Sequence, residues 1–336
     1  MNTPASKPER PSPPHELADG VRRGNRRALA KAITLVESTR PDDLPLALAL
    51  LEELHPETGG SLRIGLSGAP GVGKSTLVEA LGLHVVGCGR RPAVLAIDPS
   101  STVSGGSVLG DKTRMELLVR TEAAFIRPSP SAGAQGGVTA RTPEAIEVCE
   151  AAGFDVVIVE TVGVGQAEAE VAGMTDAFVL LEPPFAGDGL QAIKRGSIEL
   201  ADIIAYAKAD LDPIAAAAAC AHMNDALSLL RPASSAWRPR AMTVSAFTGQ
   251  GVAEMWSELQ HFQEALAAAG ALAARRQRQS VKRMWRLIDA RLRSRLLGDS
   301  AMQQQLAEIE AAVVRGDVTP AMAVSELFVL AGRRAE

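Results

Sequence analysis

Residues 62–76 read Leu-Arg-Ile-Gly-Leu-Ser-Gly-Ala-Pro-Gly-Val-Gly-Lys-Ser-Thr, and this stretch decides the fold. Residues 62–67 have the pattern of a buried strand, and a helical pattern runs from Lys74 to Val86. A strand, a glycine-rich loop and a helix in this order point successive backbone N–H groups and the positive end of the helix at one place. Such a place suits a triphosphate, so we expect the chain to bind a nucleoside triphosphate.

The residue types in this loop predict separate tasks in binding a triphosphate. We expect Lys74 to reach the β- and γ-phosphates, Ser75 to ligate Mg²⁺, and Thr76 to follow on the first helical turn. Glycine is expected where a Cβ would hold the backbone away from the ligand, which applies to Gly68, Gly71 and Gly73. The nucleotide-binding residues predicted here are Gly71, Val72, Gly73, Lys74, Ser75 and Thr76.

The composition excludes several classes of protein. Of the 336 residues, 46% are hydrophobic and 22% are charged, which is ordinary for a soluble globular protein. No apolar run approaches the roughly 20 residues of a membrane helix, and a net charge of −4 does not suggest nucleic-acid binding. Cys88, Cys149 and Cys220 form no C-x-x-C pair, which favours reduced thiols and a cytoplasmic location.

The chain divides into four predicted parts. Residues 1–15 are rich in Pro and Ser, lack the apolar stretch of a secretion signal and are expected to be disordered. Residues 16–60 predict a segment of two amphipathic helices, separated near Arg40-Pro41 because the residue before proline disfavours helix. Residues 61–264 predict the P-loop domain, and residues 265–336 predict helical arms.

The predicted P-loop domain alternates short β-branched runs with helical patterns. After the first strand, the runs are residues 93–98, 124–127, 154–160, 177–181, 202–206 and 240–245. Such alternation predicts an α/β fold, a P-loop NTPase with a mostly parallel, doubly wound sheet, flanked by N-terminal helices and C-terminal helical arms. Helix signals agree: Thr142 is expected to cap a helix that has Pro143 in its first turn and ends at Gly153, and Asp212-Pro213 opens another.

The basic stretch Arg275–Arg295 is interpreted as one face of a helix. Apolar residues recur through it at helical spacing, so the arginines are expected to form the solvated face of a packed helix; the apolar residues are Val281, Met284, Trp285, Ile288, Leu292 and Leu296. Further breaks are expected at Gly298-Asp299 and near Gly316-Asp317. The arms could pack on a second copy of the chain or fold back on their own sheet, and the sequence leaves both open.

Acidic residues at predicted strand ends are candidates for the metal site. Mg²⁺ prefers hard oxygen ligands, usually one or two carboxylates with water and phosphate oxygens. Asp98 ends one strand, Asp111 lies in a glycine- and hydroxyl-rich segment, and Glu160 ends the apolar run from Val156 to Val159, as in a Walker-B strand. The predicted metal ligands are therefore Ser75, Asp98, Asp111 and Glu160, although Asp98 and Asp111 taken singly could be ordinary turn carboxylates.

The segment after Glu160 predicts a loop that responds to the last phosphate. Gly163 offers a backbone N–H where a γ-phosphate would lie, so loss of that phosphate could release the loop. The Gln166 amide can donate and accept at once, and could therefore orient the attacking water. The predicted catalytic residues are Lys74, Glu160 and Gln166.

Two later segments predict which base is bound. In GTPases a strand ends in Asn-Lys-x-Asp, and the Asp carboxylate accepts two hydrogen bonds from guanine that adenine cannot donate. Lys208 and Asp210 fit this motif, but Ala207 stands in place of Asn. Ser245-Ala246 matches a loop that donates a backbone N–H to guanine O6. We therefore expect guanine, bound more weakly because of Ala207.

Together these segments resemble the MeaB/ArgK-type GTPases, which are chaperones of the adenosylcobalamin-dependent methylmalonyl-CoA mutase. The resemblance covers nearly the whole chain, and its specific strings lie at residues 98–102, 105–115, 125–130 and 160–166. It implies a Rossmann-like domain, a homodimer formed through the C-terminal arms, and Mg²⁺-dependent GTP hydrolysis that is slow until the mutase binds. It also implies a role in loading the mutase cofactor and protecting the mutase.

The resemblance further implies a segment that senses the mutase. It maps to residues 183–194, where the implied switch residues are Ala186, Gly187, Asp188, Gln191 and Lys194. The chain departs from the family in this segment, because Gly189 stands where an acidic residue is usual and Pro184-Phe185 replaces a small pair. The coupling to the mutase could therefore differ, or the partner could be a related cobalamin mutase.

Other functions remain open at this point. A nickel-inserting GTPase has a similar fold, but such proteins usually carry His or Cys-His clusters, whereas the histidines here are scattered at His15, His55, His84, His222 and His261. A protein kinase acting on a transport-binding protein is an older description of this family. A nucleotide-binding scaffold with little turnover is a fourth reading, favoured by Ala207. No Asp-x-His-x-x-Gly string of the cobalamin-binding kind is present, so the chain is not the mutase itself.

Overall fold

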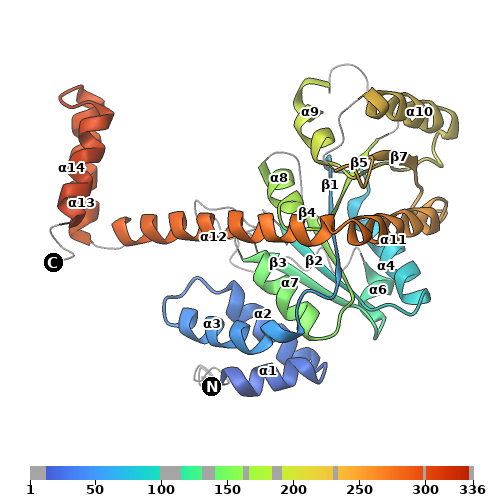
Figure 1. Cartoon of the computed structure of the whole chain (residues 1–336), viewed down its shortest axis with the longest axis horizontal. Coiled ribbons are helices and arrows are strands. Elements are labelled where there is room, and N and C mark those ends of the chain that lie inside the picture. Colours follow the sequence, from blue (N-terminus) through green and yellow to red (C-terminus); the bar gives the residue numbers. More distant parts are fainter. Residues whose placement is uncertain are drawn as a thin grey trace, which may run out of the picture. The chain divides into compact units, whose positions relative to one another are not determined.

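A seven-stranded parallel sheet forms the centre of the computed structural model (Figure 1), which describes residues 13–98, 115–130, 141–161, 166–183, 191–229, 234–297 and 300–332. The strand order is β3-β2-β4-β1-β5-β6-β7, and every neighbouring pair is parallel. The strands are β1 Leu62–Gly68, β2 Pro92–Asp98, β3 Phe125–Pro130, β4 Val156–Thr161, β5 Ala177–Glu182, β6 Ile203–Tyr206 and β7 Arg240–Thr243. The predicted fold class is confirmed, and each strand lies within two residues of a predicted run at its start.

Two hydrophobic cores cover the two faces of this sheet. Side chains of β4 alternate between them, with Val157 and Val159 in one core and Val156 and Ile158 in the other. The second core packs against α4 Lys74–Gly87, α6 Glu116–Arg120 and α11 Val252–Ala268. The first packs against α7 Thr142–Ala151, α8 Gln166–Ala172, α9 Gln191–Leu200 and α10 Pro213–Leu229, together with the N-terminal helices. The sheet is therefore doubly wound, as the uninterrupted apolar strands require.

The N-terminal segment has three helices where the sequence predicted two. They are α1 Pro14–Arg22, α2 Arg26–Glu37 and α3 Asp43–Leu54, followed by the short turn η1 His55–Glu57. The predicted break near Arg40-Pro41 is present, but a second break lies at Gly24-Asn25. Gly24 has a φ of +68°, and the Asn25 side chain accepts hydrogen bonds from the N–H groups of Arg27 and Ala28. A left-handed glycine followed by a capping Asn thus ends one helix and starts the next.

Helix signals within the domain are mostly as predicted. The carboxylate of Asp212 accepts the Ala215 N–H at 2.9 Å, so it caps α10. Gly153 follows α7 with a φ of +80°, and its N–H donates a hydrogen bond to the carbonyl of Glu150. The prediction that Thr142 caps α7 is wrong by one residue, because the N-cap position is Arg141 and Thr142 is already helical.

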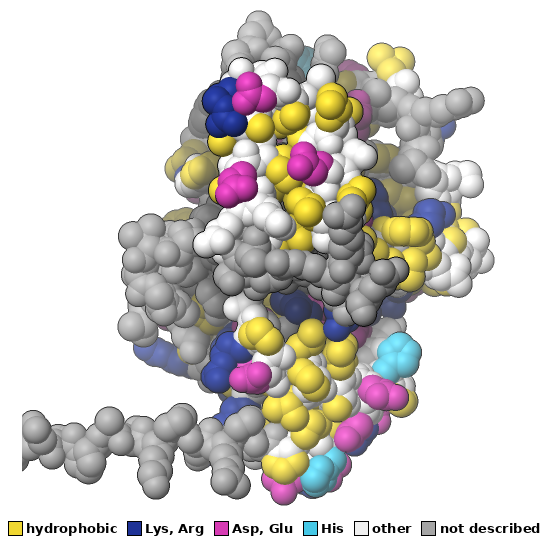
Figure 2. All heavy atoms as spheres, turned by 90° about the vertical axis from the view of Figure 1, so that its left-hand side faces the viewer, with side chains coloured by type: hydrophobic (Ala, Val, Ile, Leu, Met, Phe, Trp, Pro, Cys, Tyr) yellow, Lys and Arg dark blue, Asp and Glu magenta, His cyan; other side chains and the backbone are white. Residues whose placement is uncertain are grey.

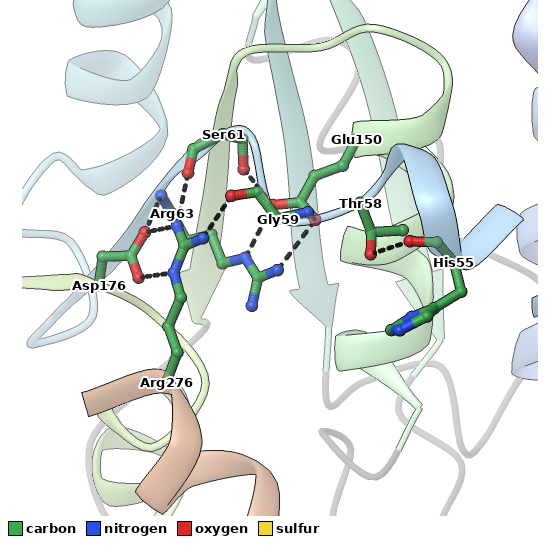
Figure 3. A network of polar contacts seen from close by, with 8 residues as sticks. All are labelled: His55, Thr58, Gly59, Ser61, Arg63, Glu150, Asp176 and Arg276. Carbon is green, nitrogen blue, oxygen red and sulfur yellow. Dashed lines mark hydrogen bonds and ion pairs between the residues drawn. The ribbon is translucent and has the colours of Figure 1, made fainter. Parts of the chain in front are cut away.

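The N-terminal edge of the sheet carries a network of buried ion pairs (Figure 3). The guanidinium of Arg276 donates to both carboxylate oxygens of Asp176, at 2.7 and 2.6 Å, and to the carbonyls of Gly59 and Ser61. Arg63 donates to both carboxylate oxygens of Glu150 in the same way, at 2.8 and 2.9 Å. These contacts join the starts of β1 and β5 to α7 and to the first turns of α12 Ala271–Leu297. A second arginine of that helix, Arg275, pairs with Asp202 just before β6.

The chain divides into two compact units, residues 1–276 and 277–336. The second contains most of α12, with α13 Ser300–Arg315 and α14 Pro320–Gly332, and the predicted break near Gly316 is present. The described residues of the α12 apolar stripe are exposed in this single chain; these are Val281, Met284, Trp285, Ile288 and Leu292. Packing of the stripe on a second copy of the chain stays a prediction. Met322, Val324 and Phe328 of α14 are also exposed, and Figure 2 shows such hydrophobic side chains at the surface.

Candidate functional site

The loop between β1 and α4 lies at the C-terminal edge of the sheet, where the chain order of the strands changes. β1 lies between β4 and β5, and parallel pairing brings the ends of all three strands to this edge (Figure 1). Ligands of open parallel sheets bind at such a place, because the loops leave in opposite directions and open a crevice. The loop runs from Gly68 at the end of β1 to Lys74 at the start of α4.

Glycines shape this loop for more than one reason. A Cβ at Gly68 would lie 2.5 Å from the carbonyl oxygen of Leu181, so backbone crowding requires glycine there. Gly71 and Gly73 have φ values of +76° and +106°, which disfavour any residue with a Cβ. At Gly71 a Cβ would meet nothing within 4 Å in the described protein, so the backbone conformation explains that glycine. The close approach of a ligand at these positions stays a prediction.

Lys74 is the charged group at the centre of the loop. Its side chain is 7% exposed, and its ammonium donates to the carbonyls of Gly68 at 2.8 Å and Ala69 at 3.0 Å. Burial lowers the pKa of Lys74, and the nearby carboxylates of Glu160 and Glu168 oppose that shift. A phosphate bound at this position would favour the charged form of Lys74, because it would place a negative charge beside a desolvated cation.

Ser75 and Glu160 bring two hard oxygen ligands together. The Ser75 hydroxyl, in the first turn of α4, donates to Oε1 of Glu160 at 2.7 Å, and Glu160 is buried near the end of β4. A hydroxyl and a carboxylate at this distance fit the oxygen donors that Mg²⁺ prefers. The structure therefore brings together two of the predicted metal ligands with Lys74. Asp98 ends β2, next to β4 at the same edge, but its side chain lies outside the described residues, as does Asp111.

A pocket of about 380 Å³ adjoins the phosphate loop. Its walls come from three places: the loop and α4, the segment after β6, and the segment after β7. They are formed by Val72, Gly73, Thr76, Leu77, Ala207, Lys208, Asp210, Leu211, Val244, Ala246 and Phe247. The sequence had assigned Val72, Gly73, Thr76, Lys208, Asp210 and Ala246 to nucleotide binding, and the structure places all of them on this one pocket. Such a mostly apolar pocket with one carboxylate suits a flat heterocycle.

Lys208 connects the base segment to the phosphate loop. Its ammonium donates to the carbonyl of Gly71 at 2.8 Å, across 137 residues of sequence. Its φ of +57° is uncommon for a residue other than glycine, and such backbone is held in place only by surrounding contacts. The Ala207 and Ala209 N–H groups supply such contacts, because they donate to the carbonyls of Glu182 and Val244. Thus the segment is tethered to the phosphate loop although Ala207 has no polar side chain.

Ser245 supports the shape of the loop after β7. It is fully buried; its N–H donates to the carbonyl of Gln250 at 2.9 Å, and its hydroxyl accepts the Thr248 N–H at 3.1 Å. Ser245 is not among the residues that line the pocket, whereas its neighbour Ala246 is. Serine at this position therefore holds the turn that presents Ala246 to the pocket.

The sequence did not assign five of the pocket residues to nucleotide binding, Leu77, Ala207, Leu211, Val244 and Phe247, and it did not predict one contact. Leu211 and Phe247 line the pocket although they are 68% and 88% exposed. Each directly follows a residue that had been predicted, Asp210 and Ala246, so their position in sequence was the available signal. The hydroxyl of Thr161 donates to that of Ser67 at 2.8 Å, and no motif pointed to this pair.

Several predicted site residues lie outside what the structure describes. Gly163 belongs to the segment 162–165, and Ala186, Gly187 and Asp188 belong to the segment 184–190. Gln166 begins α8, while Gln191 and Lys194 lie in α9, and the side chains of these three are not described. Their roles stay predictions.

The described residues also bear on metal clusters and membrane spans. These parts hold no group of three or more His, Cys, Asp or Glu side chains arranged to bind a metal ion. None of the helices described combines the length and the apolar character needed to cross a membrane. Of the three cysteines, Cys149 is buried, Cys220 is half-buried and Cys88 is exposed, and all are free thiols.

Known proteins similar to this chain give independent information on its family. A family model described as "Methylmalonyl Co-A mutase-associated GTPase MeaB" matches residues 29–301. The chain is 46% identical over 323 residues to "Methylmalonic aciduria type A homolog, mitochondrial" of Mus musculus, covering 93% of this chain and 78% of the relative. It is 44% identical over 315 residues to "GTPase ArgK" of Escherichia coli, covering 93% and 95%. The solved structure "Crystal structure of LAO/AO transport system kinase" is similar, with a TM-score of 0.76, 36% identity and 97% and 100% coverage of the two chains.

Proposed function

The chain belongs to the methylmalonyl-CoA mutase-associated GTPase family MeaB, and from this premise we propose that it is a GTP-hydrolysing chaperone of an adenosylcobalamin-dependent acyl-CoA mutase. Its P-loop fold and its relatives named as GTPases support the GTPase activity. The observation that carries the proposal is one continuous site, in which the phosphate loop shares a pocket with the Asp210 carboxylate and with Ala246. Nucleotide state would then bias the loops at this edge of the sheet.

The proposed phosphate chemistry depends on positioning more than on covalent steps. Lys74 would exchange its carbonyl partners for phosphate oxygens, and the N–H groups of residues 71–76 would surround the same phosphates. Ser75 and Glu160, with Asp98 and Asp111, would hold Mg²⁺, which supplies charge neutralisation at the β- and γ-phosphates. Gln166 would orient the attacking water, and the Gly163 N–H would report whether the γ-phosphate is present.

The proposed base contacts explain a preference for guanine. The Asp210 carboxylate would accept two hydrogen bonds from the guanine edge, and adenine offers no such donor pair. Ala246 would present its N–H to the base oxygen from the turn that Ser245 holds. The aliphatic stem of Lys208, with Leu211 and Phe247, would cover the faces of the base. Asp210→Asn is expected to reduce the preference of GTP over ATP at least tenfold, since it replaces one acceptor by a donor.

The mutase partner and the homodimer belong to the proposal as well. The family description names methylmalonyl-CoA mutase, and the name of the mouse relative refers to methylmalonic aciduria. We propose that residues 183–194 contact the mutase, through Ala186, Gly187, Asp188, Gln191 and Lys194. We also propose that the arms of residues 265–336 form a homodimer, which the exposed apolar residues Val281, Met284 and Trp285 support. The cytoplasmic location stays a prediction.

Hydrolysis assays with the purified full chain test the proposed activity. GTP hydrolysis should be slow alone and faster when a cobalamin-dependent mutase is added, and Lys74→Ala should abolish both rates. A pull-down of the mutase with wild type and with Lys74→Ala tests nucleotide gating. Equal recovery with both proteins, with and without GTP, would contradict gating.

A second candidate is a kinase that phosphorylates a transport-binding protein, because the similar solved structure is named as a transport system kinase. Incubation with γ-labelled GTP and candidate acceptor proteins separates the two functions. Label in free phosphate supports the GTPase, whereas label on a protein supports the kinase.

A further inference from the structure

Three hydrogen bonds close a ring around the phosphate loop. Lys74 Nζ donates to the Gly68 carbonyl at 2.8 Å, Ser75 Oγ donates to Glu160 at 2.7 Å, and Thr161 Oγ1 donates to Ser67 Oγ at 2.8 Å. The residues involved form three neighbouring pairs along the chain, 67–68, 74–75 and 160–161. A peptide bond joins the two residues of each pair, and the three hydrogen bonds join the pairs, so the ring connects the end of β1, the start of α4 and the end of β4.

The three hydrogen bonds differ in whether a bound ligand would displace them. Under the proposed function, which this inference rests on, phosphate takes the place of the carbonyl at Lys74 and Mg²⁺ takes the hydroxyl of Ser75. The hydroxyl pair of Ser67 and Thr161 lies inside the sheet, where the two residues are 0% and 1% exposed. Because both residues are buried inside the sheet, we expect this contact to persist through binding and hydrolysis.

The surroundings of the pair indicate that it does more than fill space. The same-face and cross-strand neighbours of the pair, Val159 of β4, Ile97 of β2 and Leu180 of β5, are apolar and buried. An apolar pair of similar shape would pack in such surroundings with little loss of stability, because two paired hydroxyls can be replaced together nearly neutrally. A hydroxyl pair instead fixes direction and distance, since a hydrogen bond has a preferred geometry and dispersion contacts do not.

We propose that Thr161 and Ser67 are positioning residues that fix the Glu160 carboxylate relative to the Ser75 hydroxyl, and thereby set the affinity of the site for Mg²⁺. Thr161 directly follows Glu160, and Ser67 directly precedes the carbonyl that holds Lys74. Loss of the pair leaves β1 and β4 joined by their backbone ladder but frees the strand ends to shift by fractions of an ångström. Removal of a group that orients a metal ligand without binding the metal itself usually changes metal affinity or activity about 10- to 100-fold.

The test uses four variants: Thr161→Val, Thr161→Ser, Ser67→Ala with Thr161→Val, and Thr175→Val as a matched control. Thr175 is a buried threonine that lies just before the N-terminal end of β5, at the edge of the sheet opposite to Thr161. Its hydroxyl donates to the Val171 carbonyl at 2.8 Å. Binding of a fluorescent GDP analogue is measured in EDTA and across a Mg²⁺ titration. Thermal unfolding and the kcat and KM for GTP are measured on the same samples.

Thr161→Val is expected to bind the analogue normally in EDTA and to need about tenfold more Mg²⁺ for half-maximal tightening, with kcat reduced more than KM is raised. The double variant should unfold near the wild-type temperature and keep the same Mg²⁺ defect. Thr161→Ser should stay within about twofold of wild type, because it keeps the hydroxyl. Thr175→Val should lower only the unfolding temperature.

Wild-type Mg²⁺ dependence in both Thr161→Val and the double variant would overturn this inference and leave the proposed function intact. Failure of the wild-type protein to bind the GDP analogue would instead overturn the proposed function, and this inference with it. If Thr161→Val does not fold, the double variant decides the question alone.

Discussion

Both edges of the parallel sheet carry buried charged groups, but they meet different partners. At the N-terminal edge the guanidinium groups of Arg63 and Arg276 meet carboxylates of the same chain, each through two hydrogen bonds (Figure 3). At the C-terminal edge the ammonium of Lys74 meets two backbone carbonyls, which carry no net charge. One edge therefore balances its charges through direct ion pairs. At the other, the carboxylates of Glu160 and Glu168 lie near the Lys74 ammonium, which gains an anionic hydrogen-bond partner when a phosphate binds.

This difference separates residues that hold the fold from residues that bind. Breaking a buried ion pair leaves an uncompensated charge, which destabilises the folded state strongly. Removing a desolvated lysine that faces carbonyls relieves a cost of burial and chiefly affects the ligand. The comparison therefore predicts stability effects at the N-terminal edge and binding effects at the C-terminal edge.

The largest effect is expected for Arg276→Ala. It leaves Asp176 buried without its guanidinium, and the loss of one partner of such a pair typically costs about 3–5 kcal/mol of folding free energy. Urea unfolding of both proteins measures this difference. Arg315→Ala is the control, because it removes an exposed pair with Asp317 and should cost less than about 1 kcal/mol. Equal effects of the two substitutions would show that the network at the N-terminal edge does not stabilise the fold.

Lys74→Ala should have the opposite profile. We expect GTP hydrolysis to fall by about 100-fold or more, since loss of one preorganised group aimed at developing charge has effects of this size. The urea midpoint should change little, because removal of the buried cation relieves a cost of burial but also removes a positive charge from beside Glu160 and Glu168. Lys282→Ala, in the exposed part of α12, serves as the control for both assays. Wild-type turnover in Lys74→Ala would remove Lys74 from the proposed site.

Ala207→Asn should strengthen nucleotide binding at the C-terminal edge. It restores the polar side chain that the base motif usually has, on the wall of the pocket, and a gained hydrogen bond of this kind corresponds to about a tenfold rise in affinity for GDP. Calorimetric titration with GDP measures the change. Ala218→Asn on the exposed face of α10 is the matched control, and equal affinities in all three proteins would contradict this prediction.

The smallest effect is expected for the pH dependence of the free energy of unfolding. Burial alone would raise the pKa of Glu150, but hydrogen bonds and charge from Arg63, with Ser61 and Gly59, hold it below the ordinary value of 4.5. Glu150 therefore stabilises the fold above that value, and its contribution is lost as the pH falls through the lower pKa of the folded state. Unfolding free energies of wild type and Glu150→Gln between pH 3 and pH 6 measure this contribution. Their difference should shrink on acidification, and a constant difference would contradict the assignment.

The two edges also differ in how well the sequence predicts them. Strand ends at the C-terminal edge carry local motifs, such as the run ending in Lys74-Ser75, so their place on the sheet followed from pattern alone. At the N-terminal edge, the pair of Arg276 and Asp176 joins residues 100 positions apart, and Arg63 and Glu150 are 87 apart. No local pattern signals such contacts, because only the folded sheet brings the residues together. The break at Gly24-Asn25, by contrast, does have a local signal, a glycine followed by a capping Asn.

The central claim is that the C-terminal edge binds a guanine nucleotide through the phosphate loop and Asp210. Calorimetric titration of the wild-type chain with GDP and ADP in the presence of Mg²⁺, repeated with Asp210→Asn, tests it most directly. The account predicts that GDP binds the wild type at least about tenfold more tightly than ADP and that the preference is lost in Asp210→Asn. Equal or tighter binding of ADP by the wild-type protein would contradict it.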